Sequence, residues 1–108
     1  MKTIATTELY EPQDVKIKKK LGGGQLKERV LREMPSGKVV EYALAYINHD
    51  IYSGDHGRVL GYDNSHRHSH KHLFGEKTDH RFTTYAELYD RFQNEWMAMA
   101  IAYANKGK

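Results

Sequence analysis

Four histidines at alternate positions are the feature of this sequence with the clearest chemical potential. They are His66, His68, His70 and His72, and they follow directly on Tyr62, Asp63 and Asn64. Histidine exchanges protons near neutral pH, binds first-row metals and contacts phosphate when it is charged. Packing alone does not require four such side chains in one short run, so the run predicts a functional site.

The spacing of the run also predicts how its side chains point. In an extended segment successive side chains point to opposite faces, so the four histidines and Asn64 would share one face. Arg67, Ser69 and Lys71 would take the other face. Neighbours on the same face would lie about 6.5 to 7 Å apart, which lets two rings meet one metal ion or one scissile phosphate.

Metal-independent RNA cleavage is the chemistry that these residue types suit best. The reaction needs a base for the 2′-hydroxyl proton, an acid for the leaving oxygen, and cations for the charged phosphorane. The candidate catalytic residues are His66, His70 and His72, with Asp63 or Tyr62 orienting a ring. The candidate nucleic-acid contacts are Arg58, Arg67, Lys71 and Arg81.

Two other interpretations of the run stay open. A His-x-His pair can place two imidazoles on a zinc or manganese ion that activates water, with Asp63, Asp55, His49 or His80 completing the site. Alternatively, the run is a solvated loop that contacts nucleic acid or a partner protein without catalysis, and Asp63 with Asn64 ends a strand. Proton transfer by histidine needs no metal, so we expect no cofactor and keep a divalent metal as the alternative.

Composition narrows the class of protein. The chain has 108 residues, enough for one domain with its own core, and it has no cysteine, which excludes disulfides and thiolate chemistry. The net charge of +3, from 17 Lys and Arg against 14 Asp and Glu, moderately favours a nucleic-acid partner. No long apolar run signals secretion or membrane spanning, so we expect a cytoplasmic protein.

The first two thirds of the chain predict β-strands. Residues 38–47 carry β-branched and aromatic side chains on both faces, which is typical of a central strand. The apolar spacing at 26–34 also suits a helix, but the Pro-Ser-Gly turn that follows favours one arm of a hairpin. Residues 58–63 form a further strand after the polar loop at 53–57 and lead into the histidine run. The lysine cluster at 16–20 is either a solvated face or an arm that tracks phosphates.

The end of the chain predicts one long helix after a polar loop at 77–81. Thr84 and Glu87 have the spacing of a capping box, in which each side chain bonds the other residue's backbone N–H. Apolar side chains then recur every three or four residues from Leu88 to Tyr103, giving one apolar stripe. This spacing makes the helix aromatics core residues rather than a platform for stacked bases.

These elements predict a single α+β domain. We expect a small antiparallel sheet of about four strands with the long C-terminal helix packed on one face. Residues 26–108 would form this domain, and residues 1–25 a basic, glycine-ended arm or edge strand.

The order of motifs resembles the TumE-like toxin family. The resemblance rests on Tyr62-Asp63-Asn64, on His66, on His70-Lys71-His72 with Gly75, and on the aromatic-rich helix that follows Phe82, and it covers about residues 38–98. It implies a growth-inhibiting toxin of a bacterial toxin–antitoxin system, with a helix-turn-helix antitoxin as partner. The chain departs from the family pattern in its first 25 residues and in the additional His68.

Together, the residues and the resemblance predict a toxin that inhibits growth by endoribonucleolytic cleavage of RNA, using the histidine cluster. The alternatives are a non-catalytic nucleic-acid-binding or regulatory protein of the same locus, and a phosphodiesterase with a histidine-ligated metal.

Overall fold

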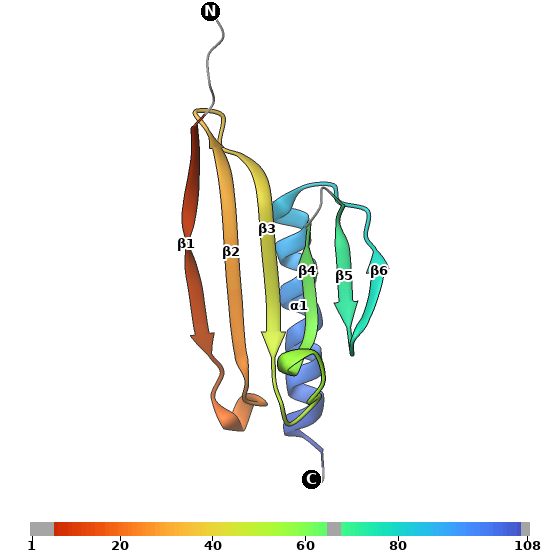
Figure 1. Cartoon of the computed structure of the whole chain (residues 1–108). Helices are drawn as coiled ribbons and strands as arrows, with labels where there is room; N and C mark the ends of the chain where they lie inside the picture. The colour runs from red at the N-terminus through yellow and green to blue at the C-terminus, as the bar shows by residue number, and fades with distance from the viewer. Residues whose placement is uncertain (1–5, 65–67, 107–108) are drawn as a thin grey trace, which may run out of the picture.

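The computed structural model describes residues 6–64 and 68–106, and these form a six-stranded sheet with one long helix (Figure 1). The strands are β1 Thr6–Lys16, β2 Gln25–Met34, β3 Lys38–Ile47, β4 Arg58–Asp63, β5 His70–Leu73 and β6 Glu76–Asp79. The helix α1 spans Tyr85–Ala104, and two short 3-10 turns, η1 Lys19–Leu21 and η2 Asp55–Gly57, lie in loops. The predicted α+β class with a C-terminal helix is confirmed, with six strands in place of about four.

The sheet is an antiparallel meander in which spatial order follows chain order from β1 to β6. Each strand pairs with its sequence neighbour, so every connection is a local hairpin. The tightest hairpin joins β5 to β6 through Phe74 and Gly75, whose φ angles are 48° and 80°. Two consecutive left-handed residues match the twist of the flanking strands, and the glycine adopts this conformation without a steric cost.

The two strands beyond the predicted four lie at the edges of the sheet. β1 pairs with β2, so residues 6–16 form an edge strand of the same sheet. β6 occupies most of the segment that we predicted as a polar loop at 77–81, and that prediction was wrong. All four β6 residues are exposed, so the strand has no alternation of buried and exposed positions that the sequence could reveal.

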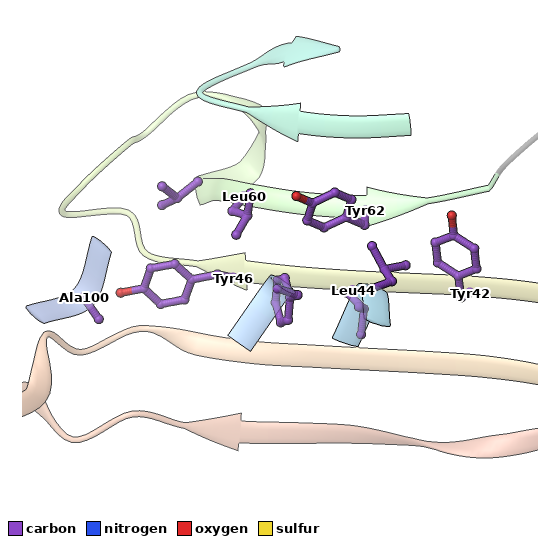
Figure 2. Packing of buried hydrophobic residues seen from close by; sticks show 9 residues of the cluster. Tyr42, Leu44, Tyr46, Leu60, Tyr62 and Ala100 are labelled. Atoms are coloured by element: carbon purple, nitrogen blue, oxygen red, sulfur yellow. The ribbon is translucent and has the colours of Figure 1, made fainter. Parts of the chain in front are cut away.

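The core lies between one face of the sheet and α1 (Figure 2). Its sheet side is built from alternate residues of the two central strands, except at the bulge in β4, where Val59 and Leu60 are both buried. Its helix side comes from residues spaced four or more apart. The buried members are Tyr42, Leu44, Tyr46, Val59, Leu60, Tyr62, Leu88, Phe92 and Ala100. The helix aromatics therefore serve packing, as predicted: Trp96, for example, lies with its ring centroid 5.7 Å from that of Tyr46.

The start of α1 has half of the predicted capping box. The Thr84 hydroxyl accepts a hydrogen bond from the Glu87 backbone N–H at 3.1 Å. The Glu87 carboxylate, however, accepts from the Thr83 hydroxyl rather than from the Thr84 backbone. The predicted helix start is thus confirmed, and a side-chain hydrogen bond from Thr83 replaces the expected bond from the Thr84 backbone to Glu87.

The glycine run that follows η1 brings the β1–β2 connection close to the end of α1. A Cβ on Gly22 would lie 2.4 Å from the Ala100 carbonyl oxygen, and Gly22 has a φ of 112°. The side chain of buried Asn48 donates to the Gly22 carbonyl at 2.9 Å. Only glycine fits this backbone conformation and this approach.

Because α1 covers one face, the other face of the sheet is uncovered by helix, and Figure 1 views the molecule from that side. We call it the open face. Side chains that alternate with the core residues of β2 to β6 point to it. In the described part of the chain, no helix is long and apolar enough to cross a membrane.

Candidate active site on the open face

The β4–β5 hairpin places an aspartate and two histidines of the predicted site on the open face. Asp63 pairs with His70 across the two strands, and Gly61 pairs with His72. His70 and His72 are separated by one residue, so both point away from the helix, with ring centroids 6.4 Å apart. The predicted alternation and spacing are therefore confirmed for this pair.

Asp63 holds the ring of His72. Nε2 of His72 lies 2.8 Å from Oδ2 of Asp63, and the two side chains are 12% and 17% exposed. A carboxylate can only accept, so Nε2 carries the proton and Nδ1 of the neutral ring keeps its lone pair. This is the arrangement of a histidine that is prepared to act as a base.

His70 lies on the other side of the same carboxylate. Its Nδ1 is 3.7 Å from Oδ1 of Asp63, and Nδ1 is buried with no hydrogen-bond partner among the described residues. Its Nε2 lies 3.9 Å from Oδ1 of Asp79, a fully exposed side chain, so this nitrogen points toward the surface. A protonated His70 would thus have a carboxylate on each side.

Arg58 brings a positive charge to the same carboxylate. Its Nε donates to Oδ2 of Asp55 at 2.8 Å, and its guanidinium nitrogen lies 3.9 Å from Oδ2 of Asp63. A bulge in β4 opposite Tyr46 and Ile47 turns Arg58 to the open face. There its side chain lies over Gly61, where a Cβ would come within 2.7 Å of Cδ of Arg58.

Asp55 and Gly61 belong to the site although their place in it was not predicted from the sequence. Asp55 was only a possible metal ligand, and Gly61 was only part of a strand. Asp55 and the next residue, His56, are left-handed, with φ of 49° and 55°, an unusual conformation that often marks functional loops. The sequence signal for this turn is Asp-His-Gly directly before an arginine, because glycine readily adopts a left-handed conformation. In the structure Gly57 has a φ of 82° and leads into β4 at Arg58.

Tyr62 and Lys71, also named as candidates, lie on the helix side of the hairpin. The Tyr62 hydroxyl donates to one carboxylate oxygen of Glu95, and Lys71 donates to the other at 2.8 Å. Tyr62 is fully buried, and burial followed by the bond to Glu95 raises the pKa of its hydroxyl. These two residues therefore attach the sheet to α1 and do not reach the open face.

We predict that Tyr62→Phe affects stability and leaves the chemistry of the open face intact. The variant loses one hydrogen bond to a charged group, which costs about 1.5 to 3 kcal/mol of unfolding free energy. Urea unfolding followed by circular dichroism measures this loss, and growth arrest on induction of the folded variant should match that of wild type. A loss of growth arrest without a loss of stability would place Tyr62 in the functional site.

His80 and Arg81 form a separate polar cluster beside the start of α1. The ring of His80 packs edge-on against Tyr62 with centroids 4.9 Å apart. Burial, and then the positive charges of Arg91 and Lys71, lower the pKa of His80. A hollow of about 100 Å³ lies between His80, Arg81 and Arg91, on the other side of the sheet from His72.

The remaining residues of the run divide into three cases. His66 and Arg67 lie outside the described residues. His68 is exposed, with its ring centroid 6.3 Å from that of His70. Asn64 does not join the histidines, because its side chain accepts from the Tyr42 backbone N–H at 3.0 Å and donates to the Val40 carbonyl at 2.8 Å. It extends the pairing of β3 beyond the end of β4.

The described residues do not assemble a metal site. No group of three or more His, Asp or Glu side chains among residues 6–64 and 68–106 has the arrangement to hold an ion. His49 and His56 are exposed on the loop before β4, and the His49 ring packs against Gly57.

The fold and the site define a small α+β protein with an aspartate, two histidines and an arginine grouped on the uncovered face of an antiparallel sheet. The family model described as Toxin TumE matches residues 2–99, so the chain belongs to the TumE toxin family. Comparison with curated proteins and with solved structures gives no match. The match begins at residue 2, so residues 2–25 lie within the family's extent as well.

Membership in this family makes the protein a toxin, and a toxin of this kind implies an antitoxin as its partner. The resemblance drawn from the sequence is thereby confirmed.

Proposed function

We propose that this toxin inhibits growth by cleaving RNA without a metal, using the cluster of Asp63, His70, His72 and Arg58. The observation that supports the proposal best is the 2.8 Å contact between Asp63 and His72, with a second histidine and an arginine around the same carboxylate. A partly buried carboxylate that orients one histidine beside another is suited to proton transfer.

In this mechanism His72 is the general base. Asp63 holds its Nε2–H, so Nδ1 takes the proton from the ribose 2′-hydroxyl, and the 2′-oxygen attacks the adjacent phosphorus. His70 is the general acid: its protonated Nε2 gives a proton to the departing 5′-oxygen. The products are a 2′,3′-cyclic phosphate and a free 5′-hydroxyl, and one proton has moved onto His72 and one off His70.

The geometry suits a phosphate between the two rings. Their centroids are 6.4 Å apart, so a phosphate placed between them can approach both, and Arg58 lies within 3.9 Å of their shared carboxylate. Arg58 can then stabilise the extra negative charge of the phosphorane. Its salt bridge with Asp55 fixes the direction of its side chain. His66 remains a candidate for the acid in place of His70.

We propose further that the antitoxin carries a helix-turn-helix domain, as the family resemblance implies, and that its toxin-binding part blocks access to the open face. The support is that this face is uncovered in the toxin alone and carries the grouped side chains. Mixing toxin with its antitoxin before adding RNA should abolish cleavage.

The test is to induce wild type and the double variant His70→Ala with His72→Ala in cells without antitoxin. Wild type should arrest growth and fragment cellular RNA, and the variant should do neither while it stays folded by circular dichroism. The purified wild-type protein should leave a 2′,3′-cyclic phosphate on a synthetic RNA, and EDTA should not slow it. Cleavage that stops in EDTA would favour the metal-dependent alternative, and toxicity in both proteins would refute catalysis by this pair.

The matched control removes two other histidines, by His49→Ala with His56→Asn. Both are exposed on the loop before β4, and asparagine accepts the left-handed backbone at position 56. This variant should arrest growth as wild type does, which shows that the effect belongs to the open-face pair and not to histidine content.

A further inference from the structure

A row of side chains crosses the open face from β2 to the edge strand β6 through His72. On the other edge strand, β1, Asp14 lies opposite the first member of the row, Lys27. Each member lies opposite the next on the neighbouring strand, so the row runs at right angles to the strands. Its members are Lys27, Ala45, Gly61, His72 and Lys77. The row thus has a cation on β2, small residues on β3 and β4, the histidine, and a cation on β6.

A second row lies beside the first and passes through two more members of the site, Asp63 and His70. It consists of Arg29, Ala43, Asp63, His70 and Asp79. In both rows β2 contributes a cation and β3 an alanine. On the open face two positive charges therefore lie on β2, and the candidate site lies on β4 and β5. Between them β3 contributes only Ala43 and Ala45 to these two rows, and we call this strip the lane.

The two β2 cations are available for a ligand. Lys27 and Arg29 are exposed, because they alternate with residues such as Val30 that face the core. Neither forms an ion pair among the described residues, whereas Arg58 and Lys71 each do. Exposed cations without a carboxylate partner are suited to bind phosphate.

The lane allows a chain to lie flat between these cations and the site. Alanine methyl groups rise little above the sheet, so nothing large stands on β3 between the β2 cations and the site. Over Gly61 the space is taken by the Arg58 side chain, so a chain that crosses here meets that cation beside the two histidines. Neighbouring strands are about 4.8 Å apart, so β2 and β5 are separated by about 14 Å. An extended nucleic-acid strand spans that distance with more than one nucleotide, which places separate phosphates at Lys27 and at His72.

We infer that a single-stranded RNA crosses the open face at right angles to the strands. Its scissile phosphate lies at His72 and His70, phosphates on one side lie at Lys27 and Arg29, and the strand leaves on the other side past Lys77. The side chains of His72 and Asp63 are only 12% and 17% exposed, so a phosphate must lie against the sheet to reach them. A single strand can do so, while a stiff duplex touches a flat face only along a short arc. This inference rests on the proposed function and adds the substrate class and its path.

The test measures binding separately from cleavage. A fluorescent single-stranded RNA with 2′-O-methyl riboses cannot be cleaved by 2′-hydroxyl attack, and its affinity for the full chain is measured by anisotropy at several salt concentrations. Lys27→Ala with Arg29→Ala should raise Kd about tenfold or more near 0.1 M salt. The slope of log Kd against log salt should fall by about 1.4, the value expected for two lost phosphate contacts on a single strand.

The matched control is Lys19→Ala with Lys20→Ala. It removes the same charge from exposed lysines of η1, in the cluster that the sequence offered as the other phosphate-tracking element. The control should change Kd less than twofold and leave the salt slope unchanged. Equal losses in the two double variants would overturn the path, because they would reflect net charge alone.

Two further outcomes keep the inference and the proposed function apart. If wild type binds the RNA through Lys27 and Arg29 but does not cleave an unmodified RNA, the path holds and the proposed reaction fails. If the Lys27 and Arg29 variant cleaves with unchanged kcat/KM and binds RNA normally but loses affinity for the antitoxin, the two cations belong to a protein interface and the path is wrong.

Discussion

Asp63→Asn should lower the rate of RNA cleavage by about 100-fold or more while the protein stays folded. The asparagine side chain has the same shape and still accepts a hydrogen bond from His72, so the backbone and the ring stay in place. It has no charge to stabilise the imidazolium that forms on His72, and its amide can also bond the ring in the wrong tautomer. General acid–base groups contribute about 10² to 10⁴ in rate, and Asp63 contacts both histidines and the arginine. Single-turnover cleavage of a synthetic RNA measures the effect.

The control for this prediction is Asp79→Asn. Asp79 carries the same charge and lies 3.9 Å from Nε2 of His70, but its side chain is fully exposed, where water and salt weaken its influence. Its substitution should change the rate less than about threefold. Similar losses in the two variants would mean that the charge of the face matters and that the contact with His72 does not.

The architecture could be predicted wherever one side of an element is buried. The strand at 38–47 alternates buried Tyr42, Leu44 and Tyr46 with more exposed residues, and α1 repeats apolar residues at helical spacing. Both patterns were visible in the sequence because burial selects residue types. β6 has no buried residue, and it is a strand because it pairs with β5. Backbone pairing does not select residue types, so the sequence shows no pattern for this strand.

The site could be predicted in part for a related reason. Alternation in a strand places His70 and His72 on one face and Lys71 on the other. The pairing of residues 70–73 with β4 confirms this prediction. Which face meets the helix depends on the register of the whole sheet, and that register sends Tyr62 into the core beside Phe92. Tyr62 and Asp63 were both predicted as site residues, but neighbours in a strand point to opposite faces, so only one of them can lie on the open face. The sequence alone does not say which one.

The contribution of Arg58 depends on a three-dimensional detail that spacing does not contain. In a regular strand Arg58 and Asp63 would point to opposite faces, because they are separated by an odd number of positions. The bulge opposite Tyr46 and Ile47 reverses this, and Gly61 leaves the space that the arginine crosses. Bulges are common beside active sites because they re-aim a side chain, and here the bulge adds a cation to the acid–base pair.

Phe92→Ala should destabilise the protein by about 3 to 5 kcal/mol and separate the role of the core from that of the site. Phe92 is 2% exposed and packs edge-on against Tyr62, the residue before Asp63, so the helix supports the strand that carries the site from behind. Small domains have only about 5 to 15 kcal/mol of stability, so toxicity at 37 °C should fall steeply. At low temperature, where the variant is folded, cleavage per folded molecule should stay within a few-fold of wild type.

Met97→Ala is the control, since Met97 is on the same helix but 45% exposed, and it should cost less than about 1 kcal/mol by thermal unfolding. If Phe92→Ala abolished cleavage while the protein remained folded, the helix side of the sheet would have to take part in the reaction, and the chemistry would not belong to the open face alone.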